Sequence, residues 1–112
     1  MGRETVGEFE QLVLLAILHL AAVGDVYGVP IVEAIEGRTN RQVSRAAVYI
    51  ALRRLEHKGH VATWMSEPIH ERGGNSRRCV RVTPAGLQAL HETRQALEDM
   101  WRGLDPELEK IQ

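Results

Sequence analysis

The chain has 112 residues with 14 basic and 15 acidic side chains, so its formal net charge at neutral pH is only −1. This length suits one domain with a modest core, and small domains of this kind often gain stability by forming oligomers. A single cysteine excludes an intramolecular disulfide, no apolar run is long enough to cross a bilayer, and the polar start does not resemble a secretion signal, so a reducing cytoplasm is the expected compartment.

The first predicted helix covers residues 8–22 and is apolar on nearly every face. Such a helix must be covered on all sides, which three small helices of one protomer cannot easily do. We therefore expect a second copy of the chain to cover part of it, with Leu12 and Leu15 in the interface.

Two further helices and a hairpin follow. A second helix is predicted over residues 27–37, and the polar stretch 37–42 indicates a connecting turn. Ser44 is the expected N-cap of a third helix that runs to about Lys58, with Gly59 as its stop. Residues 61–66 and 79–82 are strand-like, and residues 71–78 between them have the composition of a hairpin tip. This order of helices and strands predicts a winged helix-turn-helix, mainly α with a small β-hairpin.

The third helix and the loop after it carry the candidate DNA contacts. The outer face of the helix mixes small, aromatic and basic residues, which suits a helix in the major groove better than one facing water. Residues 38–81 hold ten basic side chains against three acidic ones, as a phosphate-binding face would, although a solvated charged surface explains the charge alone about as well. The predicted contacts are Arg41, Ser44, Arg45, Ala46, Tyr49, Ile50, Arg53 and Arg54, and in the loop Arg72, Gly73, Gly74, Arg77 and Arg78.

A fourth helix is expected to begin at Thr83-Pro84, where threonine caps and proline takes the first helical position. The spacing of its apolar residues alternates between three and four, which predicts a seam that pairs with a second copy or folds back on its own protomer. The seam consists of Leu87, Leu90, Arg94, Leu97, Trp101 and Leu104. Residues 1–83 are thus the predicted DNA-binding domain and residues 84–112 the dimerisation helix and tail of one compact unit.

Several motifs together carry a resemblance to a known family. They are Tyr27-Gly28, the Val-Tyr to Gly-His-Val stretch over residues 48–61, Glu71-Arg72-Gly73-Gly74 and residues 81–86. In this combination the chain resembles the PadR family of bacterial transcriptional regulators over roughly residues 8–97. The resemblance implies a homodimeric winged-helix repressor, with Tyr49 at the aromatic position of the recognition helix. The mechanism that we expect is occlusion of an operator by this dimer. Some members bind planar aromatic compounds between the subunits against a C-terminal tryptophan, which makes Trp101 a candidate ligand residue and a planar aromatic molecule a candidate effector.

Two alternatives remain open: a MarR-like regulator of similar architecture, and a winged helix that binds a protein partner instead of DNA. An enzyme is not expected, since the histidines show no metal-ligand spacing and Cys79 lacks the signature of a catalytic nucleophile. No cofactor, metal or membrane partner is predicted. Basic neighbours could lower the pKa of the Cys79 thiol, but a half-buried structural thiol is favoured.

Overall fold

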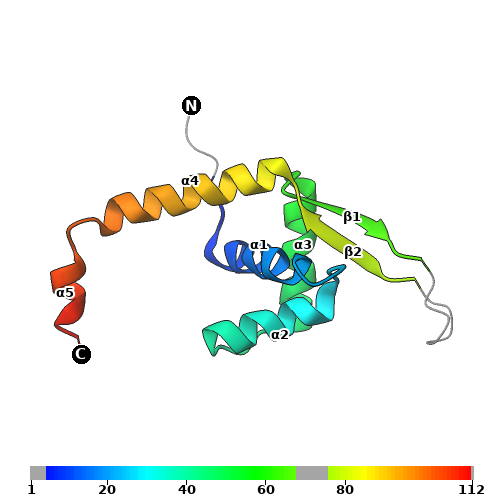
Figure 1. The fold of residues 1–112 in the computed structure, drawn as a ribbon, viewed down its shortest axis with the longest axis horizontal. Helices are drawn as coiled ribbons and strands as arrows, with labels where there is room; N and C mark the ends of the chain where they lie inside the picture. Colours follow the sequence, from blue (N-terminus) through cyan, green and yellow to red (C-terminus); the bar gives the residue numbers. More distant parts are fainter. Residues whose placement is uncertain (1–4, 68–75, 112) are drawn as a thin grey trace.

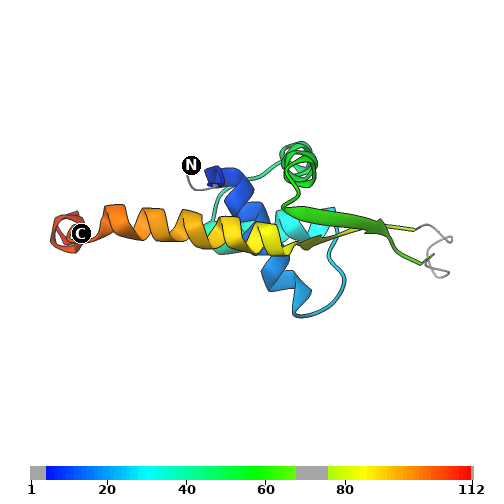
Figure 2. The same ribbon diagram turned by 90° about the horizontal axis from the view of Figure 1, so that it is seen from above.

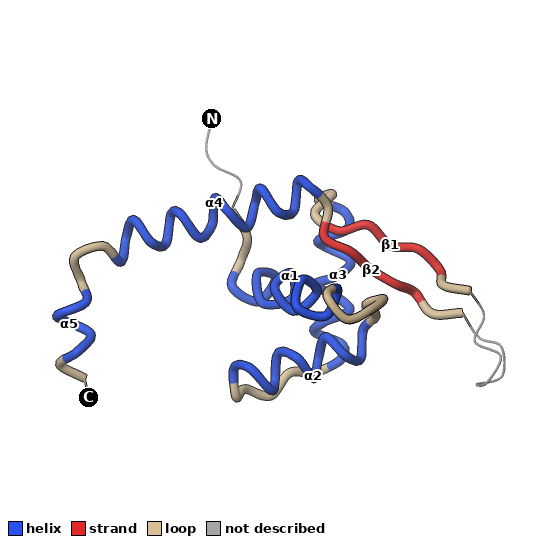
Figure 3. Tube along the Cα trace, in the orientation of Figure 1, coloured by secondary structure: helices blue, strands red, loops and turns tan. Residues whose placement is uncertain are grey.

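The computed structural model describes residues 5–67 and 76–111. The elements are α1 (Glu8–Ala21), α2 (Gly28–Thr39), α3 (Arg45–His57), β1 (Val61–Met65), β2 (Arg78–Val82), α4 (Pro84–Trp101) and α5 (Asp105–Glu109). Helices α1 to α3 form a small bundle, the hairpin projects from one side of it, and α4 extends to the other (Figure 1). This is the predicted winged helix-turn-helix, and its division between helix and strand is clear in the tube view (Figure 3).

The core lies where α1 crosses α2, α3 and the hairpin. Val13, Leu14 and Ile17 of α1 are completely buried, and they pack in one cluster with residues such as Ile31 and Leu55. Burial of one such side chain contributes about 1.5–3 kcal/mol. On the opposite side of α1, Leu15 and Leu18 remain exposed within the single chain.

The ends of α2 and α3 are set by local backbone chemistry. Asn40 adopts a left-handed conformation and closes α2, so residues 37–39 are helical and the turn predicted from residue 37 begins three residues later. The Thr39 hydroxyl donates to the Ile35 carbonyl inside this last turn. Ser44 caps α3 as predicted, because its Oγ accepts the Ala47 N–H at 3.0 Å. Gly59, at φ +80°, ends the helix in the expected place.

The hairpin is antiparallel and its register runs from Val61 opposite Val82 to Met65 opposite Arg78. The Val80 N–H donates to the Val26 carbonyl at 2.9 Å, so the segment before α2 lies along β2. The predicted wing-tip residues Arg72, Gly73 and Gly74 fall outside the described residues. The position of the hairpin beside α3 is therefore established by its two strands.

Helix α4 begins as predicted, with the Thr83 Oγ1 accepting the Gly86 N–H at 3.1 Å. Gly86 is essential here, since a Cβ at this position would lie 2.2 Å from the His60 carbonyl oxygen. Viewed from above, α4 runs along the long axis of a molecule that measures 56 × 38 × 24 Å (Figure 2).

The predicted continuous seam on α4 is wrong in two places. Leu90 is only 8% exposed and packs in the core of its own chain, because α4 packs against α1 and β2. Leu104 lies beyond the end of α4, since Gly103 at φ +87° breaks the helix and a short second helix, α5, follows. The C-terminal region is thus two helices instead of one.

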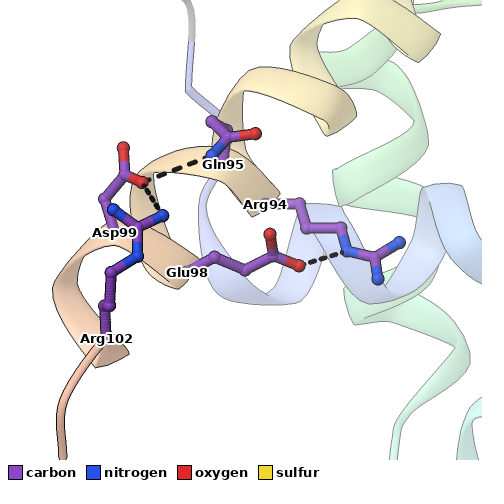
Figure 4. Close-up of polar contacts among 5 residues, drawn as sticks. All are labelled: Arg94, Gln95, Glu98, Asp99 and Arg102. Atoms are coloured by element: carbon purple, nitrogen blue, oxygen red, sulfur yellow. Dashed lines mark hydrogen bonds and ion pairs between the residues drawn. The ribbon is translucent and has the colours of Figure 1, made fainter.

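The projecting part of α4 is supported by its own side chains (Figure 4). Arg94 pairs with Glu98 at 2.8 Å, and Asp99 accepts from both Gln95 and Arg102. Pairs at this spacing stabilise a helix by about 0.2–0.5 kcal/mol each. Arg94 therefore has a partner on its own helix.

No helix among residues 5–67 and 76–111 is long and apolar enough to cross a bilayer.

Candidate DNA-binding surface

The outer face of α3 is exposed in the way the sequence predicts for a recognition helix. Tyr49 and Ile50 are each 49% exposed, and Arg45, Ala46 and Arg53 are exposed beside them. The opposite face, with Val48 and Leu55, is buried. Helix α3 therefore offers aromatic, aliphatic and cationic groups to a partner outside the chain.

The Tyr49 ring rests on the first residue of α2. A Cβ built on Gly28 would lie 2.7 Å from ring atoms of Tyr49, closer than real Cβ atoms approach a neighbour. Only glycine lets the ring occupy this position. Gly28 was not among the predicted site residues, although Tyr27-Gly28 was part of the motif pattern.

The two arginines at the start of β2, Arg77 and Arg78, contact the N-cap residue of α2 and residues of α3 and β1. The Arg78 guanidinium donates to Thr63 Oγ1 at 2.9 Å and lies 4.0 Å from Glu56 Oε2. Thr63 in turn donates to Glu56 at 2.5 Å, so this network joins α3, β1 and β2. The Arg77 guanidinium instead stacks on Tyr27, with its carbon 4.3 Å from the ring centroid. Tyr27, Glu56 and Thr63 were not among the predicted site residues, because the hairpin arginines that they contact are distant along the chain.

These groups surround a concave space of about 630 Å³ between the start of α2, α3 and the hairpin. Its walls include Tyr27, Tyr49, Arg53, Glu56, Arg77 and Arg78. The structure thus brings together residues from both predicted parts of the site, the helix and the wing. Three guanidinium groups against one carboxylate make this hollow suited to an anion.

Other predicted contacts lie to the side of this hollow. Arg41 pairs with Glu8 of α1 at 3.0 Å. Ile50 and Arg54 line a separate recess of about 440 Å³ with Glu8 and Phe9. Contact with DNA at these positions would take place beside acidic groups of α1, which weakens the attraction for phosphate.

Cys79 is buried, with only 1% of its surface exposed. Burial raises the pKa of its thiol, the Asp25 carboxylate raises it further, and Arg77 opposes them. The thiol lies 3.8 Å from the Arg77 carbonyl, which it faces as a donor. The lowering of its pKa by a basic neighbour, weighed from the sequence, is therefore outweighed by burial and by Asp25, and the thiol is structural and more deeply buried than expected.

The predicted dimerisation residues divide into two groups. Leu15, Leu97, Trp101 and Leu104 are exposed within the single chain. Leu12 is half-buried against the core, and Leu90 is buried in it.

Among residues 5–67 and 76–111, no three His, Cys, Asp or Glu side chains gather closely enough to hold a metal ion.

The fold and this surface define a winged helix-turn-helix regulator. The chain belongs to the transcriptional regulator PadR-like family, whose model matches residues 17–92. It is 38% identical over 96 residues to the protein named Transcriptional regulator Rv3488 of Mycobacterium tuberculosis, and the match covers 85% of each chain. The family is one of transcriptional regulators, so the expectation that the chain is not an enzyme is confirmed.

Solved structures share the fold. A transcriptional regulator from Clostridium thermocellum superposes with a TM-score of 0.67 at 21% identity, covering 87% of this chain and 89% of that one. A PadR-like regulator from Bacillus cereus gives 0.65 at 19% identity, covering 92% and 89%. Bacillus subtilis PadR, solved in complex with operator DNA, gives 0.59 at 16% identity and covers 75% of this chain and 46% of that one.

Proposed function

We propose that this protein is a homodimeric repressor that binds a near-palindromic operator and blocks a promoter. The observation that carries the proposal is the hollow beside α3, where Tyr49 and Arg53 of the helix meet Arg77 and Arg78 of the hairpin. In this arrangement α3 enters the major groove and the hairpin follows the adjacent backbone. The complex of Bacillus subtilis PadR with operator DNA supports this use of the fold.

Each group on the surface has a distinct role. Ala46 and Ile50 meet thymine methyl groups, and Arg45 and Arg53 reach base edges or phosphate. The Tyr49 hydroxyl and the hairpin arginines contact phosphate oxygens, which position the protein without reading the sequence. The predicted tip residues Arg72, Gly73 and Gly74 extend the same contact along the backbone.

The dimer forms through α1 and the C-terminal helices. Leu15 and Leu18 on α1, and Leu97 and Trp101 on α4, leave apolar surface exposed in the single chain. Large apolar surfaces of this kind are normally covered by a partner. Two recognition helices then meet successive major grooves about 34 Å apart along the duplex.

A planar aromatic effector would act at this interface. Trp101 is 49% exposed near the end of α4, and its ring offers a stacking face between two copies of the chain. A ligand held there changes the angle between the two winged domains, so that both can no longer fit their grooves. Replacing Trp101 with Phe should weaken the binding of a planar cationic dye, measured by fluorescence, and leave the dimer intact.

Fluorescence anisotropy of a labelled duplex tests the DNA-binding role. The duplex is taken from the region upstream of the protein's own gene and compared with a scrambled duplex across a salt series. A dimer that neutralises about six to eight phosphates gives a log-log salt slope of roughly −5 to −7. Tyr49→Ala and Arg53→Ala should each weaken binding, while Lys110→Ala, which removes a charge near the chain end, serves as the control.

A winged helix that binds only protein partners predicts a different outcome. Neither duplex would bind even at low salt, and the variants would not differ from the parent protein. Equal binding of both duplexes, with a steep slope, would leave an electrostatic DNA-binding protein without sequence preference. Light scattering of each variant reports the oligomeric state and separates loss of DNA contact from loss of the dimer.

A further inference from the structure

We propose that Tyr27 is a positioning residue, which holds the Arg77 guanidinium ready for a DNA phosphate and ties the wing to the segment that supports α3. The inference rests on the proposed DNA-binding function. Tyr27 lies at the N-cap of α2, and its ring stacks on the Arg77 guanidinium at 4.3 Å. The two residues come from segments 50 positions apart in the chain.

The backbone of Arg77 is already held by Ser66, the residue that follows β1. Its N–H donates to Ser66 Oγ at 2.9 Å, and its carbonyl accepts from the Ser66 N–H at 2.7 Å. Only the long side chain is left to order. A free arginine side chain loses much of its rotamer freedom when it binds a phosphate, so a stack that restricts it beforehand reduces this cost.

A stack is a suitable restraint because it uses the flat face of the guanidinium. The N–H groups around its edge stay available to donate to a phosphate. Arg78 differs, since one of its nitrogens donates to Thr63 and lies close to the Glu56 carboxylate. Among the described residues, no carboxylate forms an ion pair with Arg77. Arg77 is therefore the hairpin arginine that is both ordered and open to an anion.

Tyr27 can serve as a fixed reference because its own segment is attached to both DNA-facing elements. The carbonyl of the preceding residue, Val26, accepts the Val80 N–H of β2 at 2.9 Å. The following residue, Gly28, lies against the Tyr49 ring of α3. One short segment thus contacts the aromatic residue of the recognition helix and the arginine of the wing.

The test is a double-mutant cycle on Tyr27 and Arg77 in the full-length chain, read out by anisotropy with the upstream duplex over a salt series. Two stacks in a dimer, each contributing a factor of about two to five, predict that Tyr27→Leu weakens binding about 4- to 25-fold. If one phosphate contact is lost in each subunit, the slope becomes shallower by about 1.8. Arg77→Ala should give the same change of slope, and the double variant should add little.

The conservative variant Tyr27→Phe keeps the ring and should retain the affinity and slope of the parent protein. A Tyr27→Leu variant with unchanged slope, or effects of the two substitutions that simply add, would overturn the proposal. So would a loss of affinity that is accompanied by a lower melting temperature and an unchanged slope, because that pattern belongs to a purely structural tyrosine. If Tyr27→Leu does not fold, Tyr27→Met takes its place in the cycle.

Failure of the proposed function is distinguishable from failure of this inference. If the parent protein binds neither the upstream nor the scrambled duplex, the DNA-binding role itself is refuted, and the positioning role with it. If the parent protein binds with a steep slope and Tyr27→Leu behaves identically, only the positioning role is refuted.

Discussion

Gly28→Ala should impair DNA binding while leaving the stability of the protein almost unchanged. The new Cβ would lie 2.7 Å from the Tyr49 ring, whereas carbon atoms in contact are about 3.5 Å apart, so the ring must move by about 0.8 Å. The ring can move, since Tyr49 is 49% exposed and only its outer atoms are affected. This motion displaces the Tyr49 hydroxyl, which contacts a DNA phosphate in the proposed complex.

The expected stability change is the difference between two small terms. Alanine at a compatible glycine position stabilises by about 0.4–1 kcal/mol through the unfolded state. Pushing the Tyr49 ring away from its rotamer costs about 0.5–1.5 kcal/mol. The free energy of unfolding should therefore stay within about 1 kcal/mol of the parent value, a shift in melting temperature below about 5 °C.

The expected effect on binding is larger. A hydrogen bond from a hydroxyl to a charged phosphate contributes about 1.5–3 kcal/mol, and a dimer makes two. At the lower end of this range, the loss of both corresponds to a rise in Kd of roughly 150-fold. Anisotropy measures this Kd, and urea unfolding measures the stability of the same preparation.

A Tyr49→Phe background tests whether the Tyr49 hydroxyl is responsible for the loss of binding. In a Tyr49→Phe background the hydroxyl is already absent, so Gly28→Ala should produce little further loss of binding. Unchanged binding of Gly28→Ala in the parent protein would show that the position of the Tyr49 ring does not matter for DNA. A loss of several kcal/mol of stability would show that the ring cannot yield.

Four further predictions follow from the same contacts. Gly86→Ala should destabilise the protein by more than about 3 kcal/mol in urea unfolding, because its Cβ would meet the His60 backbone oxygen at 2.2 Å and backbone cannot yield as a side chain can. Ser44→Ala removes the N-cap of α3 and should cost about 1 kcal/mol in the same assay; a cost near zero would contradict the cap. Leu97→Asp should convert the dimer to a folded monomer in light scattering, and a dimeric variant would remove α4 from the interface. The pKa of the Cys79 thiol is raised in the folded state, so its contribution to stability is complete at neutral pH and is lost as pH rises past the usual pKa of a thiol. Above that pH, the free energy of unfolding should fall more steeply in the parent protein than in Cys79→Ala.

The features that the sequence predicted well are the local ones. Ser44 and Thr83 cap their helices with their own hydroxyls, and Gly59 ends α3 in a backbone conformation that other residues rarely adopt. Each of these effects acts within a few residues of chain. The order of helices and strands, and the buried and exposed faces of α3, follow from the same kind of short-range pattern.

The errors arose where a local pattern met a competing interaction. Residues 37–39 are polar enough for a turn, yet they continue α2 because Asn40 supplies a left-handed cap one position later. The spacing of Leu90 fits an exposed seam, but the packing of α4 against α1 and β2 buries it in the core. A periodic pattern shows which residues share a helix face and does not show what that face contacts.

The sequence by itself determined the winged helix-turn-helix order, because caps, turn residues and periodicity act over short distances along the chain, and its motifs indicated the family by resemblance. Only the tertiary structure decided that Tyr27 stacks on Arg77, that Glu56 and Thr63 hold Arg78, and that Gly28 supports the Tyr49 ring. Most of these pairs join residues far apart in the chain, and their distances depend on how the helices pack together, which no local pattern records.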